Sequence, residues 1–464
     1  MFILMVIIFV LGYAAIALEH PLKIDKAASA LLIGVLTWVI YILGSADILG
    51  LGHSTAWEKF LVLNPDKDTA AGMVDFIAHH EILHHLGEIS EILFFLLGAM
   101  TIVEIVDQHQ GFKLITDRIT TTNKVKLLWI LSFLTFFMSA ALDNLTTTIV
   151  LVALLRKLIA DKETRWFFAS MVVLAANAGG AWSPIGDVTT IMLWIGGQVT
   201  TVNIITMVIL PSLVTMIVPL VILTFSLKGT VERPVLDDSQ TKEFTTEKER
   251  KFVLIFGVSA LLFVPVFKTV THLPPYMGML FGLGVLWVIT EIMHKRKSEE
   301  DKRRLSVVGI LTKVDVPTVL FFLGILSAVA SMQSAGQLGI LADFLDENLH
   351  DIYLINLAIG ILSSIVDNVP LVAGAMGMYD IAPAGAEAYQ AFFVVDGLFW
   401  EFLAYCAGTG GSILIIGSAA GVAAMGMEKI DFIWYFKKIS LLAFIGYIAG
   451  AGAYYLQAII LNHA

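Results

Sequence analysis

Charge and cysteine are scarce in this chain. Of its 464 residues, 15% are charged and 58% are hydrophobic, and the mean hydropathy is +0.84. Soluble proteins average about a quarter charged residues, so this composition excludes an ordinary soluble domain and predicts a membrane protein. Cys406 is the single cysteine, which excludes an intrachain disulfide and a multi-cysteine metal site. No basic stripe occurs, so a nucleic-acid partner is not expected despite the net charge of -10.

The hydrophobic runs predict transmembrane helices surrounded by lipid. They are near-continuous over about 20 residues, the length of a spanning helix, and do not alternate as barrel strands do. The first run, residues 1–18, lacks a basic leading region, so we expect a retained span and not a cleaved signal peptide. The predicted spans lie at about 2–18, 27–49, 125–160 (broken), 166–197 (broken), 202–226, 252–271, 276–293, 351–385 (broken), 389–426 (broken) and 433–458.

An unusual dipeptide interrupts two of these spans. Asp143-Asn144 and Asp367-Asn368 each break a segment that is otherwise apolar enough to lie in a bilayer. A carboxylate at the bilayer centre costs roughly 2.5 to 3.5 kcal/mol, so an acid at such a depth indicates an ion or proton path. The dipeptide therefore predicts a functional site in each half of the chain.

Two further features repeat around these dipeptides. A glycine pair with a third glycine six residues beyond it follows each one, at 179–186 and at 410–417. A Leu-Phe-Phe-Leu stretch that opens a predicted membrane-dipping hairpin precedes each one, at Leu93 and Leu320. Repeats with Gly/Pro-interrupted segments at corresponding positions are typical of secondary transporters whose site lies near the bilayer midplane.

The fold class follows from this duplication. We predict an all-α polytopic membrane protein with two inverted repeats, each with a re-entrant hairpin and broken transmembrane helices. Five spans separate the two hairpins, which is why the halves should be inverted. The predicted divisions are 1–85 for N-terminal scaffold helices, 86–226 for the first repeat, 227–313 for charged connectors and a linking helical pair, and 314–464 for the second repeat.

Loop charge leaves the orientation open. Lys and Arg are dense in 227–251 and 294–304, which the positive-inside rule places in the cytoplasm. Lys113, Arg118 and Lys124 beside the first hairpin oppose that assignment. Which hairpin faces the cytoplasm is therefore not decided by the sequence.

The four breaks supply the oxygen ligands that a hard cation such as sodium prefers. A carboxylate that binds sodium when ionised and a proton when neutral carries one ion or the other, so alternating access makes it an exchanger. For an isolated threonine, helix packing is the simpler explanation, whereas for the aspartates a functional role is favoured. The candidate residues are Asp143, Asn144, Thr146, Thr147, Thr148, Asn177, Ser183, Asp187, Thr189, Thr190, Ser363, Ser364, Asp367, Asn368, Ser412 and Ser418, with sodium expected at Asp143 and Asp187.

A histidine-rich stretch at 79–85 allows three interpretations. His80 and His84 share a helical face, and His80-Glu81-Ile82-Leu83-His84 has the His-Glu-x-x-His order of zinc enzymes. A metal site would need a third ligand from elsewhere in the chain, so a transition metal is not predicted. The second interpretation is a solvated helix at the membrane interface. The third is a pH-responsive element, because histidine titrates near neutrality. Possible proton relays or pH sensors are His80, His84, Glu88, Glu91 and Glu104.

These motifs resemble those of the NhaD-type sodium/proton antiporters of bacteria, in the ion transporter superfamily, over nearly the full length. The resemblance implies lithium as a second substrate, a homodimer, and a mobile core that moves as an elevator. It implies cation-site roles for Asp143, Asn144, Asn177, Asp187, Thr189, Thr190 and Asp367, with Ser412 and Ser418 lining the path. It also implies a multi-pass protein of the bacterial inner membrane that serves pH homeostasis without a cofactor. It rests on SAALDNLTTTIV (139–150), NAGGAWSPIGDVTTIMLW (177–194), FFLGIL (321–326), IVDNVPLVAGAMGM (365–378) and GTGGSILIIGSAAGVAAMG (408–426).

Two other functions are weighed against this one. An anion carrier of the same superfamily, for dicarboxylate or arsenite, is disfavoured because Asp143 and Asp367 would repel its substrate. An intramembrane aspartyl enzyme is disfavoured because no Ser/His or metal motif accompanies the acids, and an enzyme has no need of duplicated breaks.

Overall fold

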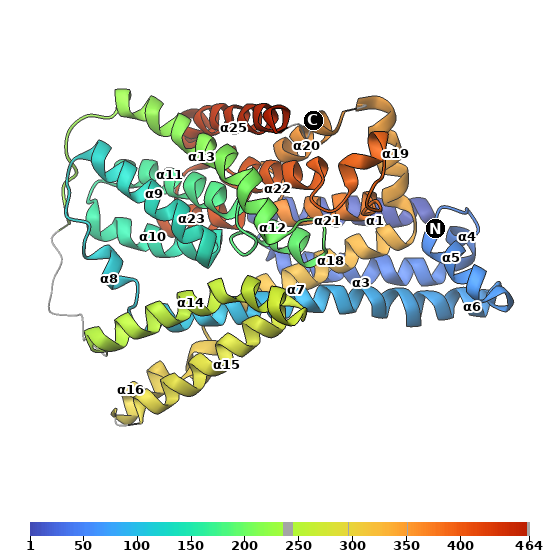
Figure 1. Cartoon of the computed structure of the whole chain (residues 1–464), viewed down its shortest axis with the longest axis horizontal. Coiled ribbons are helices and arrows are strands. Elements are labelled where there is room, and N and C mark those ends of the chain that lie inside the picture. Colours follow the sequence, from blue (N-terminus) through green and yellow to red (C-terminus); the bar gives the residue numbers. More distant parts are fainter. Residues whose placement is uncertain (235–244, 296, 350, 462–464) are drawn as a thin grey trace. The chain divides into compact units, whose positions relative to one another are not determined.

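The computed structural model describes residues 1–234, 245–295, 297–349 and 351–461, which are almost entirely helical (Figure 1). Within these residues only two isolated β-bridges occur. The predicted all-α polytopic membrane protein is confirmed. Part of the predicted connector 227–251, residues 235–244, lies outside the described residues, as does Arg296. Helices long and apolar enough to cross a membrane are Lys26–Leu43, Ala70–Gln108, Lys124–Leu142, Thr201–Ser226, Glu247–Thr271, Pro275–His294, Val316–Ser334 and Phe432–Ile460.

Contacts divide the chain into two compact units. Unit 1 comprises Met1–Leu93, Asp315–Ile355 and Val369–Val394, and unit 2 comprises the remaining described segments. In unit 1, the helices α3 (Lys26–Leu43) and α18 (Val316–Ser334) pack closely. Other helices of this unit include α1 (Phe2–Ala17), α2 (Glu19–Leu22), α4 (Ser45–Leu49), α5 (Thr55–Leu63), α6 (Ala70–Asp75) and α19 (Gln337–Leu349).

Glycine permits the close approach of α3 and α18. A Cβ on Gly34 would lie 2.5 Å from the carbonyl oxygen of Gly324, so the two backbones touch where neither has a side chain. Beside this point the indole nitrogen of Trp38 donates to the carbonyl of Ser327 at 3.0 Å. Small residues at a contact and a polar bond across it are the usual means of holding membrane helices together.

The broken helices that the sequence predicts are present, and all of them except residues 352–355 and 369–378 belong to unit 2. The chain leaves regular helix at the Asp-Asn dipeptides and after the glycine pairs, so the predicted breaks are confirmed. The four broken pairs are α9 (Lys124–Leu142) with α10 (Asn144–Leu158), α11 (Lys162–Ala181) with α12 (Val188–Ile195), α20 (Ile352–Leu362) with α21 (Asn368–Met378), and α22 (Leu398–Gly410) with α23 (Ala419–Glu428).

The two predicted hairpins differ in form. The second is a helical hairpin, α18 followed by a turn at Gly336 and α19. The first has a much longer incoming limb, since α6, a π-helical turn (Phe76–Glu81) and α7 (Ile82–Gln108) run without interruption. Its return limb is the short α8 (Lys113–Thr116). The region 70–108 contains no proline to end the helix before Leu93, and Gly87 meets open space.

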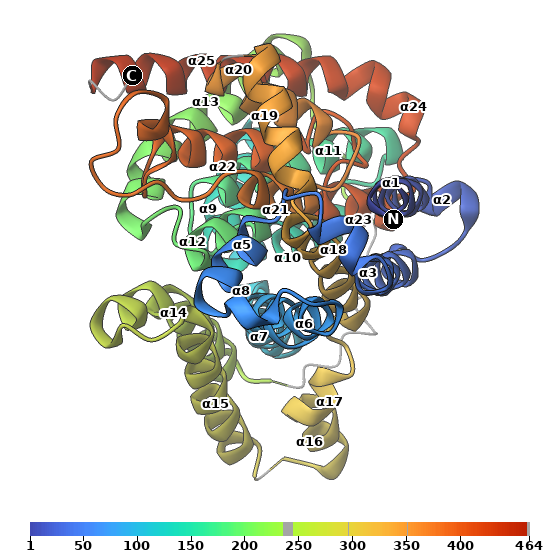
Figure 2. The ribbon, with the colours of Figure 1, turned by 90° about the vertical axis from the view of Figure 1, so that its right-hand side faces the viewer.

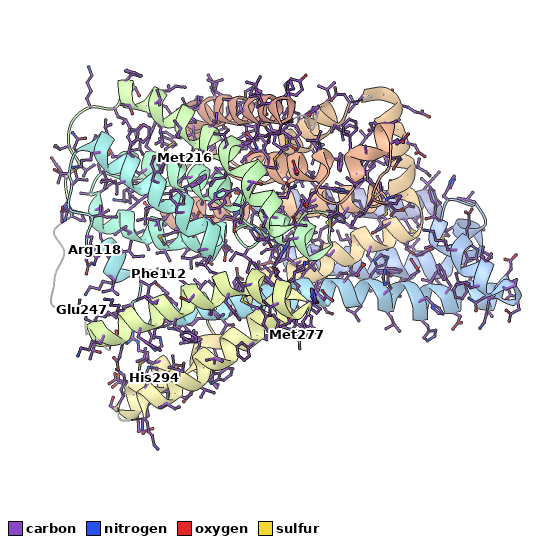
Figure 3. All side chains as sticks on the ribbon, viewed as in Figure 1. Phe112, Arg118, Met216, Glu247, Met277 and His294 are labelled. Atoms are coloured by element: carbon purple, nitrogen blue, oxygen red, sulfur yellow. The ribbon has the colours of Figure 1, made fainter. Side chains whose placement is uncertain are left out.

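The other helices of unit 2 include two further packed pairs. Helix α13 (Thr201–Ser226) packs along α25 (Leu441–Ile460), which follows α24 (Phe432–Tyr435) and a π-helical turn (Figure 1). Helices α14 (Glu247–Thr271) and α15 (Pro275–His294) form the predicted linking pair; Glu247 and His294 lie at one end of it and Met277 at the other (Figure 3). Helices α16 (Glu299–Leu305) and α17 (Val307–Leu311) then return beside α15 (Figure 2).

Candidate functional site

Asp143 occupies a strained position between two half-helices. It ends α9 and begins α10, with φ of 81° and ψ of 160°, a region that non-glycine residues rarely adopt. Its carboxylate compensates by capping α10: Oδ1 accepts from the backbone N–H of Thr146 at 2.7 Å, and Oδ2 accepts from the Thr146 hydroxyl at 2.8 Å. This turn presents the next residue, Asn144, to the interior, where it is buried.

Asp187 is the centre of the polar cluster. It is 1% exposed and caps α12, with Oδ1 accepting from the backbone N–H of Thr189 at 2.8 Å and from its hydroxyl at 2.6 Å. The amide of Asn144 donates to Oδ2, and the amide of Asn368 lies 3.4 Å from Oδ1. Residues from the first, second and third breaks therefore meet on one carboxylate.

The fourth break joins through Asn177 of α11. Its side-chain nitrogen donates to the hydroxyls of Ser412 and Ser418, both at 2.9 Å, while its oxygen accepts from Asn144 at 3.1 Å. All of these groups are buried. Asn144 and Asn177 thus connect Asp187 to the glycine-rich break of the second half. The structure brings together Asp187, Asn144, Asn177, Thr189, Asn368, Ser412 and Ser418, with Asp143 close enough to Asp187 to interact electrostatically.

The local geometry of the breaks repeats. A Cβ on Gly180 would lie 2.4 Å from the oxygen of Gly186, and one on Gly411 would lie 2.9 Å from the oxygen of Gly417. Ser139 and Ser363, each four residues before the aspartate of a dipeptide, make equivalent hydrogen bonds. Ser139 donates to Ala176 O at 2.6 Å and Ser363 donates to Ala407 O at 2.9 Å. Both halves therefore use the same backbone contacts to hold their breaks open. The inversion of one half relative to the other, and the predicted divisions of the chain, stay predictions.

Several predicted hydroxyls face elsewhere. Ser183 bonds to Ala140 O at 2.5 Å, Thr190 lies 3.4 Å from Ala181 O, and Ser364 bonds to Ile361 O at 2.7 Å. These three hold backbone at the breaks in place. In contrast, the buried hydroxyls of Thr147 and Thr148 have no hydrogen-bond partner in the structure, which makes them available to a ligand.

The histidine stretch lies on the continuous helix of unit 1. His80 is exposed with its ring 4.8 Å from that of Phe60, and His84 lies 3.4 Å from Glu88, also at the surface. The buried histidine is His85, 3.8 Å from Glu81, a pair that the sequence analysis did not single out. No group of three or more His, Cys, Asp or Glu side chains suited to a metal occurs within the described residues.

Of the two other predicted relays, Glu104 accepts from Gln108 at 2.8 Å. Gln108 in turn accepts from Lys313. Glu91 is partly buried on α7. The carboxylate of Glu104 therefore bonds within its own helix and not to the four breaks. Its role, like that of Glu91, stays a prediction.

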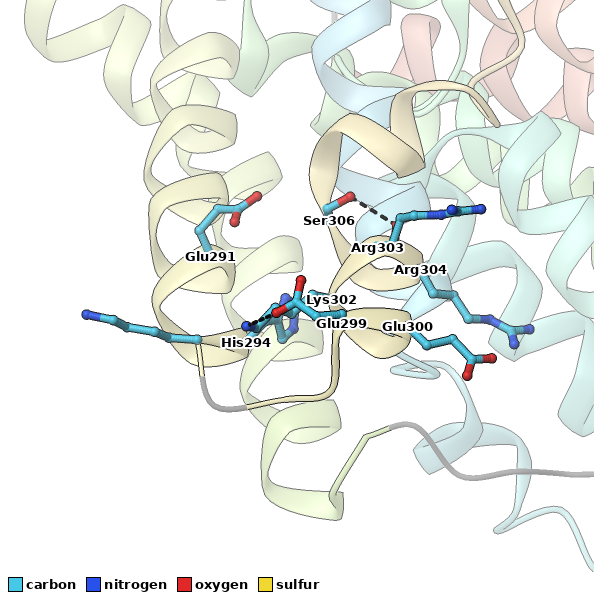
Figure 4. A pocket seen from close by; sticks show the side chains of 9 residues that line it. Glu291, His294, Glu299, Glu300, Lys302, Arg303, Arg304 and Ser306 are labelled. Carbon is cyan, nitrogen blue, oxygen red and sulfur yellow. Dashed lines mark hydrogen bonds and ion pairs between the residues drawn. The ribbon is translucent and has the colours of Figure 1, made fainter.

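A surface pocket of about 1020 Å³ lies between α15 and α16 (Figure 4). Glu291 faces it from α15, while Lys302 forms a 2.6 Å ion pair with Glu299 on α16. The pocket contains no residue of the breaks and mixes both signs of charge, so we do not assign an ion to it. A smaller cavity of about 220 Å³ lies beside α10, lined by Asp107, Gln110, Phe112, Lys113, Ile149, Val150, Ala153, Leu154 and Lys157.

Glu401 is a buried acid that the sequence analysis did not single out. Glu401 lies within the apolar run Leu398–Phe402 and is 3% exposed. The argument applied to Asp143, that an acid in an apolar segment is costly, also holds for Glu401. That signal was present in the sequence.

Comparison with known proteins defines the family. A model described as "Citrate transporter" matches residues 3–395. "Sodium/proton antiporter 1" of Arabidopsis thaliana is 48% identical over 97% of this chain and 71% of its own length, and "Sodium/proton antiporter 2" is 44% identical over 97% and 98%. The "Na(+)/H(+) antiporter NhaD" of Alkalimonas amylolytica is 29% identical over 95% and 88%. The chain therefore belongs to the citrate transporter family, among the NhaD-type sodium/proton antiporters.

Proposed function

We propose that this protein exchanges Na⁺ for H⁺ across a membrane by alternating access, with the two ions competing for Asp143 and Asp187. One observation carries the proposal: no Lys, Arg or His within the described residues bonds to either carboxylate, although Asp187 is 1% exposed. A buried carboxylate without a cation is strongly disfavoured, so it must hold a cation or a proton. A carboxylate that must always hold either a cation or a proton can exchange one for the other, as an antiporter does.

The surrounding amides allow both states. Asn144 and Asn368 present their NH₂ groups to Asp187 in this structure, as suits an ionised carboxylate. Each amide also carries an oxygen, and rotation of the side chain would turn that oxygen toward a bound cation. The unpartnered hydroxyls of Thr147 and Thr148 add two more oxygens. Sodium can thus replace donated hydrogen bonds with oxygen ligands.

Citrate is the substrate named by the family description, and an anion carrier is the second candidate. The charge of the site favours the cation. A tricarboxylate would meet the carboxylates of Asp143 and Asp187 without a basic side chain bonded to either. Like charges at close range in a site of low dielectric repel by several kcal/mol. The relatives named above are antiporters for sodium and protons, which also supports the cation. The family is one of transporters, so the enzyme alternative is dropped.

The cavity beside α10 supports an access route. Its lining includes Ile149 and Val150, one to two turns along α10 from Asp143, together with Asp107 and Lys157. The buried side-chain oxygen of Gln110 in its wall has no hydrogen-bond partner in the structure. A cavity that runs along the helix of the first break would bring water and ions toward the site from one side.

Flux in reconstituted vesicles tests this function. A sodium gradient is imposed and internal pH is followed, with and without a clamp on membrane potential, for the parent and for Asp143→Asn, Asp187→Asn and Asp367→Asn. We expect the first two variants to lose exchange and the third to be severely impaired, because an amide cannot alternate between a proton and a cation.

Asp161→Asn is the matched control. Asp161 also caps a helix, with Oδ2 accepting from the N–H of Thr164 at 2.7 Å, but it lies outside the broken segments. Exchange should be unchanged in this variant, and each protein should show the parent's elution volume in detergent. Normal exchange by Asp187→Asn, or uptake of citrate by the parent without proton exchange, contradicts the proposal.

We also propose that the protein transports lithium. Lithium should replace sodium in the flux assay, since a site of oxygen ligands on a hard monovalent cation accepts both. Relatives at 44 to 48% identity are plant proteins and those at 27 to 30% are bacterial. We propose the bacterial inner membrane as the location, a homodimer as the assembly and pH homeostasis as the role; cell fractionation, cross-linking in the membrane and growth at alkaline pH in sodium test them in turn.

A further inference from the structure

Glu401 is a second kind of buried acid in unit 2. It lies in the first turn of α22, and its side chain points between α13 and α25, where Asn203 and Tyr454 contact it. The ring of Phe402 stacks on that of Tyr454 with centroids 4.8 Å apart and closes one side. Glu401 belongs to none of the four breaks, and it has no part in the site described above.

The hydrogen bonds around Glu401 are complete when the acid is neutral. The Asn203 side-chain nitrogen is a donor only, so Oε1 of Glu401 must accept from it. The Tyr454 hydroxyl lies 2.7 Å from Oε2 and 3.3 Å from the carbonyl oxygen of Leu398. A phenol has one hydrogen and so donates once. With a proton on Oε2, Glu401 donates to Tyr454 and Tyr454 donates to Leu398, and every contact is used.

Among the residues that the structure describes, no cationic side chain bonds to Glu401 to stabilise its ionised form. Helices α12, α13 and α25, which pack on α22, have no charged side chain, and the charges of α11 lie in its first turn, Lys162–Arg165. The charged residue five positions before Glu401 is another acid, Asp396, which caps the start of α13 through Thr200. A second negative charge disfavours ionisation of Glu401 further.

Glu401 is joined mechanically to the ion site. It precedes Gly408 by seven residues of α22, a rise of about 10 Å. A Cβ on Gly408 would lie 2.9 Å from the side chain of Ala181 and 4.0 Å from the hydroxyl of Thr189, which bonds to Asp187. Glu401 is therefore too distant to share a cation with Asp187, yet it lies on the helix that leads into the fourth break. Asp396, which is half-buried, lies just before the start of this helix.

We propose that Glu401 is a separate proton-carrying site, which gains and loses one proton in each transport cycle while sodium is held elsewhere. The O–H bond on Oε2 breaks when water reaches it, and the proton leaves as hydronium. On the opposite side the carboxylate takes a proton from hydronium, which becomes water, before α22 returns. This inference rests on the proposed sodium/proton exchange. The proton carried by Glu401 raises the number of protons moved per sodium ion by one, in addition to the protons that compete with sodium at Asp143 and Asp187.

The test is the number of protons moved per sodium ion. In vesicles without membrane potential, the pH gradient that just stops exchange is measured against a fixed sodium gradient, for the parent and for Glu401→Gln. We expect Glu401→Gln to keep exchange and to move one proton fewer per sodium ion. Tyr454→Phe, which removes the hydroxyl and keeps the acid, should keep the parent's ratio. An unchanged ratio in Glu401→Gln overturns the proposal.

If Glu401→Gln loses exchange altogether, its proton-to-sodium ratio cannot be measured, so a second measurement tests the proposal on the parent protein. Infrared spectra of the parent in lipid are recorded as pH is varied over the range in which exchange occurs. A protonated carboxylic acid has its own carbonyl stretch, and we expect a band that disappears at the alkaline end and is absent at every pH in Glu401→Gln. A band that persists throughout, or the lack of any band assigned to Glu401, overturns the proposal. Failure of the parent to exchange contradicts instead the function on which it rests.

Discussion

Asn177 is the residue through which the second and fourth breaks are joined. In the variant Asn177→Leu, the hydroxyls of Ser412 and Ser418 lose their donor, and Asn144 loses its acceptor. An unpaired buried polar group costs about 1–3 kcal/mol, so we expect the apparent affinity for Na⁺ to fall about tenfold or more in the flux assay. Ser170→Ala, on the same helix with its hydroxyl bonded to Trp166 O, should leave it unchanged. Equal affinities in both variants contradict the assignment.

His109 gives a pH dependence of stability. Its Nδ1 lies 2.6 Å from Ile105 O and must carry the hydrogen, so its Nε2 accepts from Nε2 of His294 at 2.9 Å. Burial lowers the pKa of His109 below its usual 6.5, opposed by the bond to Ile105. Glu249 and Lys297 nearby are paired with each other at 2.9 Å.

The sign follows from proton uptake. As pH falls below 6.5, the unfolded chain binds a proton at His109 that the folded protein does not, so folding stability decreases from pH 6.5 down to the folded pKa. We expect the melting temperature of the purified parent to fall over this window more steeply than that of His109→Gln, whose side chain does not titrate. Parallel slopes for the two proteins would show that His109 is not the group responsible.

At the scale of elements, glycine allows the backbones of two broken helices to touch, because no side chain lies between them. A Cβ on Gly410 would lie 2.1 Å from the carbonyl oxygen of Gly360, so Gly410→Ala must push α22 away from α20. Overpacking of this kind costs about 1–3 kcal/mol, and we expect a lower melting temperature in detergent. Gly452→Ala on α25 meets nothing within 4 Å and serves as the control. A parent-like melting temperature for Gly410→Ala would mean that α20 and α22 are not in contact in solution.

Lys268 of α14 holds the far end of α12. Its ammonium lies 3.0 Å from the carbonyl oxygen of Trp194 and 4.6 Å from the centroid of that ring. A cation at a helix C-terminus and over an indole contributes about 1 kcal/mol or more. Since Asp187 begins this same short helix, we expect Lys268→Met to weaken apparent Na⁺ affinity about fivefold, with maximal rate little changed.

A conservative variant separates this role from general stability. Lys268→Arg keeps the charge and the donor, so it should restore affinity, whereas Lys302→Met on the exposed α16 should have no effect. If Lys268→Met and Lys268→Arg are equally impaired, the helix-end contact is not what positions Asp187.

Competition for one set of carboxylates is a property of the whole transport cycle. If sodium and protons bind in alternation, lowering pH on the sodium-loading side should raise the apparent KM for Na⁺, by about tenfold per pH unit for each competing proton, while saturating Na⁺ restores the maximal rate. Initial rates measured at several pH values and sodium concentrations decide this. A maximal rate that falls with pH at constant KM would show that the two ions do not compete.

Much of the molecule was predictable from local sequence. Hydropathy and the positions of Asp143, Gly180, Asp367 and Gly411 were sufficient to predict most of the long apolar helices and the four breaks. The helices Ala70–Gln108 and Val316–Ser334, which are long enough to cross a membrane, were predicted only as parts of re-entrant hairpins. The hairpin at Leu93 was only half right, because nothing in the apolar pattern shows that the helix before it continues upstream to residue 70. Which of the breaks' hydroxyls face Asp187 and which hold backbone was not predictable either.

The sequence by itself determined the membrane class, the segments that break and the acids that must be accommodated, because hydrophobicity and helix breaking depend on residues near one another in the chain. Only the tertiary structure decided which polar atoms meet. Asn177 and Ser412 bond across 235 positions, and Glu401 finds Asn203 and Tyr454 on two different helices. Such pairings depend on the packing of the whole helical core, where each buried donor must find an acceptor, and no local pattern encodes that choice.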